Sequence, residues 1–304
     1  MPSTTSQPLS IAVIGAGRIG SSFAYQLHRA GHDVTVVARP GSKRLAQLER
    51  GNGIVLTTGE RAEVTVADRL DERKPFDVVI VTVLAHQVDS VLPALSRSKA
   101  RTVLFMFATP EAERLRAAVG AERASFGFAG VLATIAEDGK LNLKIQRVKA
   151  TLEEQRWVDL FVDAGMPAKL QPDMASYLRT HAPLTIAMES VTGMGMAEGR
   201  NTRWSEARIG TRGIKASSKI LKATGDKPVG LSRAPGFVLT GFLWATARAP
   251  FREAVGDSDA EARGLIDLYV AEARTKPGMQ DAADALLALR PGDGPRVHLA
   301  PRTA

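Results

Sequence analysis

The chain contains no cysteine among its 304 residues. This excludes disulfide bonds, thiolate metal ligands and a cysteine nucleophile, and it fits a reducing compartment, so we expect a cytoplasmic protein. No set of histidine and acidic residues has the spacing of a metal site, and we expect no bound metal.

Long hydrophobic runs are also lacking. The longest apolar run, "GFVLTGFLWATA" at 236–247, is too short to span a bilayer and predicts a buried core helix. The N-terminal "MPSTTSQPLS" has neither the basic nor the apolar region of a signal peptide. We therefore expect no membrane partner.

The formal net charge is +8, yet the basic residues are scattered along the chain. No run interleaves aromatic with basic residues, as nucleic-acid binding would favour. We expect a solvated basic surface and no nucleic-acid partner. Some of the arginine is then available for a cofactor that carries phosphate.

The first part of the chain alternates strand-like and helix-like segments. Apolar runs that predict strands are "IAVI" (11–14), "DVTVVA" (33–38), "GIVLTT" (53–58), "AEVTVA" (62–67), "FDVVIVTV" (76–83) and "RTVLFMF" (101–107). "SFGFAGVLATIAEDGKLNLKI" (125–145) predicts two strands around the turn "EDGK". Thr151 and Glu154 form a capping-box pattern that predicts a helix from 151 to 165. Residues 1–172 therefore predict an α/β domain of the Rossmann type.

Strand-like runs end near residue 172. From Met174 to Leu289 the pattern predicts helices joined by turns rich in Gly and Pro. We expect a second, all-helical domain over 173–304, in which 290–304 is a loose tail.

The segment "VIGAGRIGSSFAYQL" has the G-x-G-x-x-G spacing at Gly15, Gly17 and Gly20, between a predicted strand and a predicted helix. In this context the glycines allow a tight turn, close approach of a pyrophosphate, and close packing of helix on strand. We predict dinucleotide binding here, with Arg18 and Ile19 of the same turn as further contacts. A glycine-rich turn in an unrelated α/β fold is the alternative.

The end of the second strand indicates which dinucleotide is bound. Enzymes that use NAD place an acidic residue there, whereas this chain reads "VVARPGSKR". Arg39, with Lys43 close behind, suits the 2′-phosphate of NADP, so we predict NADPH. An exposed basic loop is the alternative, and it applies more to Lys43 and Arg44 than to Arg39.

The strings "IAVIGAGRIGSSFAYQLHRAGHDVTVVAR" and "VVIVTVLAHQVDSVLPAL", followed by a helical second half, resemble the ketopantoate reductase (2-dehydropantoate 2-reductase) family. The resemblance implies reduction of a 2-keto acid by NADPH in a cleft between the two domains. It also implies a homodimer through the helical domain. Family positions at the cofactor correspond here to Thr82, Val83, Leu84, Gln87 and Phe107.

Two of these positions depart from the family pattern. Leu84 stands where the family has a lysine, and Phe107 stands where it has an asparagine that holds cofactor and substrate. Both replacements are apolar, so we predict a larger or less polar carbonyl or imine substrate than ketopantoate.

The family's proton-donating lysine lies on the first helix of its second domain. Aligned without a gap, this helix puts His181 at the lysine, with Thr185 and Glu189 at two asparagines; a slip of the alignment puts Arg179 there instead. Histidine serves as a general acid near neutral pH, and the i, i+4, i+8 spacing puts all three residues on one helix face. Because Pro183 is tolerated only in a first turn, we expect the helix to begin near Thr180 or to kink. A structural histidine at a domain junction is the equally weighted alternative.

Tyr177 and Trp204 are additional candidates to line a substrate pocket, although aromatic residues in helices usually belong to the core. The predicted function is an NADPH-dependent reductase. Alternatives are a non-catalytic NADPH-binding sensor, ketopantoate reductase proper, and a β-hydroxyacid or opine-type dehydrogenase.

Overall fold

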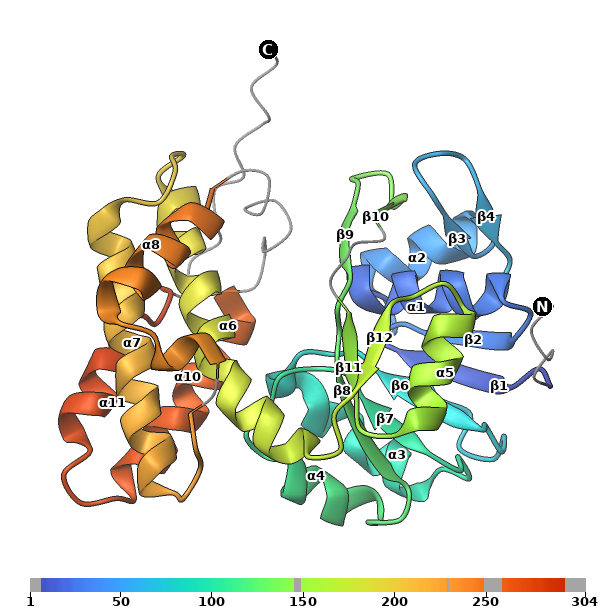
Figure 1. The fold of residues 1–304 in the computed structure, drawn as a ribbon. Coiled ribbons are helices and arrows are strands. Elements are labelled where there is room, and N and C mark those ends of the chain that lie inside the picture. Colours follow the sequence, from blue (N-terminus) through green and yellow to red (C-terminus); the bar gives the residue numbers. More distant parts are fainter. Residues whose placement is uncertain (1–6, 145–148, 229, 249–258, 293–304) are drawn as a thin grey trace, which may run out of the picture. The chain divides into compact units, whose positions relative to one another are not determined.

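The computed structural model describes residues 7–144, 149–228, 230–248 and 259–292. They form two compact units (Figure 1). The first contains the described residues up to Phe107 together with Glu111–Met174. The second contains Ala108–Pro110 and the described residues from Ala175 onward.

The first unit is built on an eight-stranded sheet in the order β12-β11-β8-β7-β6-β1-β2-β5. From β5 to β8 all neighbouring strands are parallel, β11 is antiparallel to β8, and β12 is parallel to β11. This is the strand order of the Rossmann fold, with its topological switch point between β1 and β6. The strands are β1 (Ser10–Ile14), β2 (Asp33–Val37), β5 (Thr65–Ala67), β6 (Val78–Val81), β7 (Val103–Phe105), β8 (Ala124–Phe128), β11 (Ala150–Leu152) and β12 (Ala168–Leu170). The predicted fold class is confirmed.

Helices cover both faces of this sheet, and the side chains between them are apolar. All four residues of β6 are buried, as a parallel strand covered on both sides requires. Phe23 of α1 packs edge-to-face against Phe161 of α5, with ring centroids 5.0 Å apart, over the core that holds Ile11 and Val13. The helices of this unit are α1 (Arg18–Arg29), α2 (Lys43–Arg50), α3 (Leu92–Arg97), α4 (Ala112–Val119) and α5 (Gln155–Asp163), with the 3-10 helix η1 (Ala85–Ser90).

Segment 125–145 forms three strands, not the two that we predicted. β8 joins the main sheet, while β9 (Leu132–Ile135) and β10 (Leu141–Lys144) form a separate antiparallel hairpin. Segment 62–67 is divided in a similar way: β4 (Arg61–Ala62) pairs with β3 (Ile54–Val55), and β5 extends the main sheet.

The predicted helix start at Thr151 is wrong. Thr151 lies in β11, where it is paired with Phe128 of β8, and α5 begins only at Gln155. The local capping pattern is overridden because this residue is needed in the sheet and is fully buried there.

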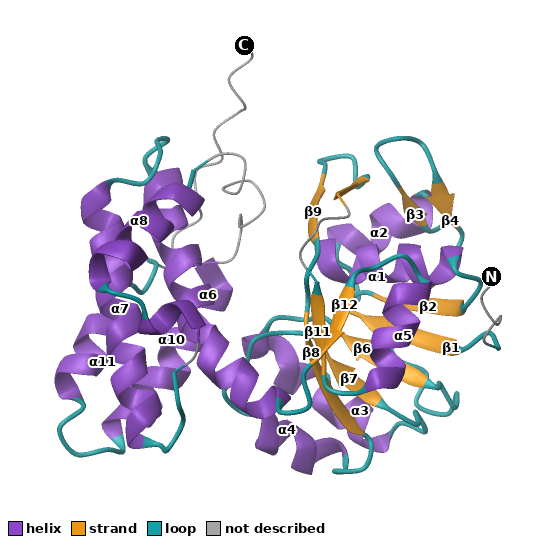
Figure 2. Cartoon of the chain, viewed as in Figure 1, coloured by secondary structure: helices purple, strands orange, loops and turns teal. Residues whose placement is uncertain are grey.

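The second unit is helical throughout its described part (Figure 2). Its helices are α6 (Met174–Ala197), α7 (Trp204–Ala223), α8 (Gly236–Thr246), α10 (Asp259–Arg274) and α11 (Gln280–Leu287), with the 3-10 helix η2 (Gly230–Arg233). The apolar run 236–247 is a helix, but it is not buried all round: Leu239 and Leu243 are buried, whereas Phe237 is 76% exposed. Among the described residues no helix is long and apolar enough to cross a membrane. Most of the predicted loose tail, 293–304, lies outside the described residues.

Helix α6 runs through Pro183 without ending. A proline has no N–H, so the carbonyl of the residue four positions earlier, Arg179, loses its helical partner. The hydroxyl of Tyr269 on α10 donates a hydrogen bond to that carbonyl. This tertiary contact supplies the donor that Pro183 lacks. Helix α6 begins at Met174, not near Thr180, so His181 lies in its second turn.

Candidate cofactor site and proton donor

The glycine-rich turn leaves the end of β1 and enters α1 at the switch point of the sheet. Gly15 has φ +102°, and a Cβ there would lie 2.9 Å from Thr82 Oγ1. A Cβ on Gly20 would lie 1.9 Å from the carbonyl oxygen of Gly15. The hydroxyl of Thr82, directly after β6, lies 2.8 Å from the carbonyl oxygen of Gly15 and 3.1 Å from that of Ile14 and donates its one proton between them. These contacts require glycine at both positions and fasten the turn across the switch point.

Gly17 differs from the other two glycines. It is exposed, its φ of −68° is open to any residue, and a Cβ there would meet nothing within 4 Å. It is the N-cap of α1, and the first turn of that helix has no acidic residue. The free N–H groups and the positive end of a helix favour a phosphate at such a position. The turn therefore fits the pyrophosphate of a dinucleotide, which Gly17 would approach most closely, with half-buried Arg18 and Ile19 beside it.

Basic side chains follow the end of β2. Arg39 and Lys43 are exposed, and neither side chain has a hydrogen bond or ion pair within the described part of the chain. Both are therefore available to a ligand. Ser42 caps α2 by accepting a hydrogen bond from the N–H of Leu45 (3.2 Å).

The alternative of an exposed basic loop does not hold for Arg44, which lies in α2. Its guanidinium is half-buried and donates to the carbonyls of Ala16 (2.9 Å) and Gly139 (2.6 Å) and to Ser21 Oγ (2.9 Å). Sequence reasoning missed this contact because its partners are backbone atoms and a serine in distant segments.

The segment after β6 carries the remaining cofactor candidates. Val83 and Leu84 are half-buried, and Leu84 is the N-cap of η1. The N–H of Leu84 donates to Oε1 of Gln87 at 3.3 Å, so the exposed Gln87 side chain folds back over the start of this 3-10 helix. Phe107, beyond the end of β7, is 5% exposed and packs edge-to-face on Phe105. Phe107 therefore can make only apolar contacts with a ligand.

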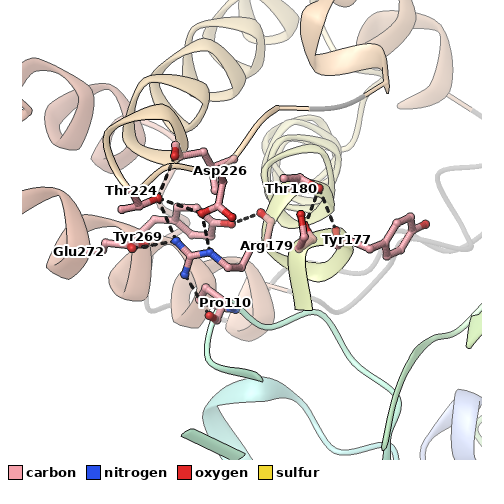
Figure 3. A network of polar contacts seen from close by, with 10 residues as sticks. Pro110, Tyr177, Arg179, Thr180, Thr224, Asp226, Tyr269 and Glu272 are labelled. Atoms are coloured by element: carbon pink, nitrogen blue, oxygen red, sulfur yellow. Dashed lines mark hydrogen bonds and ion pairs between the residues drawn. The ribbon is translucent and has the colours of Figure 1, made fainter. Parts of the chain in front are cut away.

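Arg179 is the centre of a polar network in the helical unit (Figure 3). Its guanidinium donates to Asp226 Oδ2 (2.9 Å), Glu272 Oε1 (2.9 Å), Thr224 Oγ1 (3.2 Å) and the carbonyl of Pro110 (3.1 Å). Burial acts to lower the pKa of Arg179, but hydrogen bonds with Glu272 and Asp226 outweigh it and raise this pKa above its usual value. Because most of its donors are engaged, we assign Arg179 to the stability of the helical unit and not to substrate contact.

His181 stacks on Tyr177, one turn earlier on α6, with ring centroids 5.1 Å apart and an interplanar angle of 13°. Both residues are half-buried, as is Thr185 on the next turn. Glu189, a further turn along, is 7% exposed. The helix thus presents two partly accessible aromatic rings, one of which is an imidazole, the side chain most often used for proton transfer.

Trp204 begins α7 and is 48% exposed. It packs edge-to-face against Trp244 of α8, with ring centroids 6.0 Å apart. Among the described residues no cluster of histidine, cysteine and acidic side chains could hold a metal ion.

Residues 11–154 match the model of the ketopantoate reductase PanE/ApbA family. A curated relative, the 2-dehydropantoate 2-reductase of Bacillus subtilis (strain 168), is 34% identical over 99 residues. That match covers 32% of this chain and 32% of the relative, so it spans about a third of the length of either.

Solved structures resemble the whole chain. D-mandelate dehydrogenase with NADH aligns with a TM-score of 0.72 at 15% identity, over 93% of this chain and 97% of that one. A dimeric ketopantoate reductase from Staphylococcus aureus aligns with a TM-score of 0.64 at 15% identity, over 93% of this chain and 99% of that one. These likenesses establish the fold of an α/β unit followed by a helical unit.

Proposed function

We propose that this chain, whose residues 11–154 match the ketopantoate reductase family model, is a member of that family and an oxidoreductase that uses a nicotinamide dinucleotide. NADPH is the preferred cofactor, and the substrate is a carbonyl or imine compound other than ketopantoate. The observation that carries the proposal is the turn Gly15–Gly20, which is held by Thr82 at the switch point and open at Gly17.

The preference for NADPH is supported by Arg39 and Lys43. Both cations are exposed after β2, where an enzyme that uses NAD carries an acidic residue. A guanidinium binds a phosphate through charge-assisted hydrogen bonds, and a carboxylate would repel it. The fold neighbour D-mandelate dehydrogenase binds NADH, so the choice of dinucleotide in this chain depends on its own residues.

The nature of the substrate is inferred from what surrounds the end of the sheet. By resemblance, Leu84 and Phe107 occupy positions where the family has a lysine and an asparagine. Phe107 is buried and Leu84 half-buried, and neither side chain can donate a hydrogen bond to a carboxylate. These positions favour a substrate with an apolar group. Thr185, Tyr177 and Trp204 of the helical unit are further candidates for substrate contact, and Val83 remains a candidate for cofactor contact.

His181 is the proposed proton donor. A bound nicotinamide supplies the hydride, and the oxygen or nitrogen that gains charge needs a proton from the protein. The imidazole of His181 is half-buried and stacks nearly parallel on the ring of Tyr177, which restricts its orientation. Glu189, on the same helix face, is assigned a structural role because it is buried.

The proposal is tested by NADPH oxidation in the presence of a panel of 2-keto acids, ketones and cyclic imines that includes 2-dehydropantoate. We expect turnover with an apolar carbonyl or imine and little with 2-dehydropantoate. Turnover with 2-dehydropantoate above all others would identify ketopantoate reductase proper, which the identity to the Bacillus relative favours. NADPH binding without oxidation by any substrate would instead indicate a non-catalytic sensor.

A homodimer and a cytoplasmic location are part of the proposal. The dimeric relative from Staphylococcus aureus supports the first, and light scattering of the full chain tests it. Cell fractionation tests the second.

A further inference from the structure

Arg44 joins three segments of the first unit through one guanidinium. Nε donates to the carbonyl of Ala16, one terminal nitrogen donates to Ser21 Oγ, and the other donates to the carbonyl of Gly139. Ser21 Oγ also donates to the carbonyl of Ala16 at 3.0 Å. Ala16 stands between Gly15 and Gly17, so Arg44 is anchored inside the turn that we assign to the dinucleotide.

Gly139 lies in the turn between β9 and β10. This hairpin turn is closed by hydrogen bonds from Gly139 N to Ala136 O and from Ala136 N to Lys140 O, both 2.9 Å long. It sits directly on α2: Gln47 Nε2 donates to the carbonyl of Glu137 at 3.1 Å, and a Cβ on Gly139 would lie 2.7 Å from Gln47 Cδ. Helix α2 therefore contacts the hairpin, and Arg44 on this helix bonds to both the hairpin and the dinucleotide turn, beside the packing of α1 on β9 and β10.

The charge of Arg44 has no counter-ion on the protein within the described residues, because its partners are two carbonyls and a hydroxyl. Burial lowers the pKa of its guanidinium, which reflects the cost of holding this charge away from water. The N-terminus of α1 beside it is also positive and has no acidic residue in its first turn. A phosphate at the turn would compensate both charges.

We propose that Arg44 is a positioning residue that couples the β9–β10 hairpin to the dinucleotide turn. A bound dinucleotide phosphate stabilises turn and hairpin together, and release of the hairpin from α2 weakens dinucleotide binding by the same factor, since coupling between two sites is reciprocal. The identity of the ligand as a dinucleotide rests on the proposed function. The link between turn and hairpin rests only on the contacts of Arg44.

The test is amide hydrogen exchange of the full chain, wild type and Arg44→Met, with and without NADPH. Without NADPH, we expect Arg44→Met to speed exchange about tenfold both at Ser21 N, which bonds to Gly17 O in the turn, and at Gly139 N in the hairpin. With NADPH at about 100 times its Kd, hairpin exchange in the wild type slows by up to about a hundredfold. At equal saturation the hairpin of Arg44→Met does not slow, and its Kd for NADPH is about tenfold weaker.

Arg116→Met is the matched control. Arg116 is a half-buried arginine of the same unit, paired with Glu153 at 2.8 Å and placed over the ring of Phe126, and it contacts neither turn nor hairpin. We expect a similar loss of thermal stability with an unchanged Kd and unchanged hairpin protection by NADPH. Arg44→Lys keeps the charge but not the forked geometry, so NADPH affinity recovers in part and hairpin protection does not.

The coupling is overturned if Arg44→Met loosens the hairpin alone and leaves both Ser21 N and the Kd for NADPH as in the wild type. A wild type that binds no NADPH contradicts the proposed function, while exchange in the cofactor-free protein still decides whether Arg44 links the two segments.

Discussion

The hydroxyl of Tyr269 donates a hydrogen bond to the carbonyl oxygen of Arg179, the atom whose helical partner is removed by Pro183 (Figure 3). Tyr269 is fully buried, and burial raises the pKa of its hydroxyl above the usual value, which favours the protonated form that donates this bond. One side chain on α10 thus keeps α6 continuous, and with it the helix face that carries His181.

A double-mutant cycle tests this relationship. Tyr269→Phe leaves a buried carbonyl without a donor, and we expect it to lower the free energy of unfolding by about 1–3 kcal/mol. Pro183→Ala restores an N–H for the same carbonyl, so Tyr269→Phe should cost clearly less in that background. Urea unfolding of the four proteins measures the coupling; additivity within about 0.5 kcal/mol would show that Tyr269 does not replace the missing donor.

Gly17→Ala separates cofactor binding from stability. Because Gly17 has an ordinary φ and open space around its Cβ position, the entropy gained with alanine roughly offsets the loss of a better N-cap residue, and the free energy of unfolding should stay within about 1 kcal/mol of the wild type. The added methyl group would occupy the space we assign to the pyrophosphate, so NADPH affinity should fall at least about tenfold. The matched variant Gly20→Ala should lose both NADPH affinity and stability, because its Cβ collides with the Gly15 carbonyl. Wild-type NADPH affinity in Gly17→Ala would place the dinucleotide elsewhere.

Arg39→Asp tests the choice of dinucleotide. Loss of a charge-assisted hydrogen bond to the 2′-phosphate should raise the Kd for NADPH by about ten- to a hundredfold. The Kd for NADH should stay within a few-fold of the wild-type value. Calorimetric titration of both cofactors measures the two effects, and Lys99→Asp, an exposed cation that follows α3, controls for net charge. An equal rise in the Kd for NADPH and for NADH would contradict the assignment of Arg39 to the 2′-phosphate.

His32 predicts a pH dependence of stability. It is 6% exposed, its Nδ1 accepts a hydrogen bond from Leu9 N at 3.2 Å, and burial lowers its pKa below the usual value. The folded state therefore binds fewer protons than the unfolded state just below about pH 6.5. The contribution of neutral His32 to the free energy of unfolding is complete above that pH and is lost as the pH falls. His32→Asn keeps an acceptor and does not titrate; its Tm should fall less than that of the wild type between about pH 6.5 and 5. Parallel Tm curves would contradict this role.

The sequence was sufficient for features that depend on neighbouring residues. Glycine spacing located the turn between β1 and α1, and apolar runs located the central strands of the sheet; that the turn binds a dinucleotide stays a prediction. Prediction from the sequence failed where contacts between distant residues determine the local structure. Thr151 pairs with Phe128 in the sheet, and Tyr269 donates to the Arg179 carbonyl, 90 positions away, that Pro183 leaves without a helical donor. Arg44 was misplaced for the same reason, since its hairpin partner lies 95 positions away.

We propose that this chain reduces a carbonyl or imine substrate with NADPH and that His181 supplies the proton. The most direct measurement is the rate of NADPH oxidation by wild type and His181→Ala, with the best carbonyl or imine of the panel and with NADPH affinity measured in parallel. We predict a rate in His181→Ala that is lower by about 10²–10⁴-fold with an unchanged Kd for NADPH. An equal rate in both proteins would contradict the role of His181, and a wild type that binds NADPH but oxidises it with no substrate would contradict the enzyme.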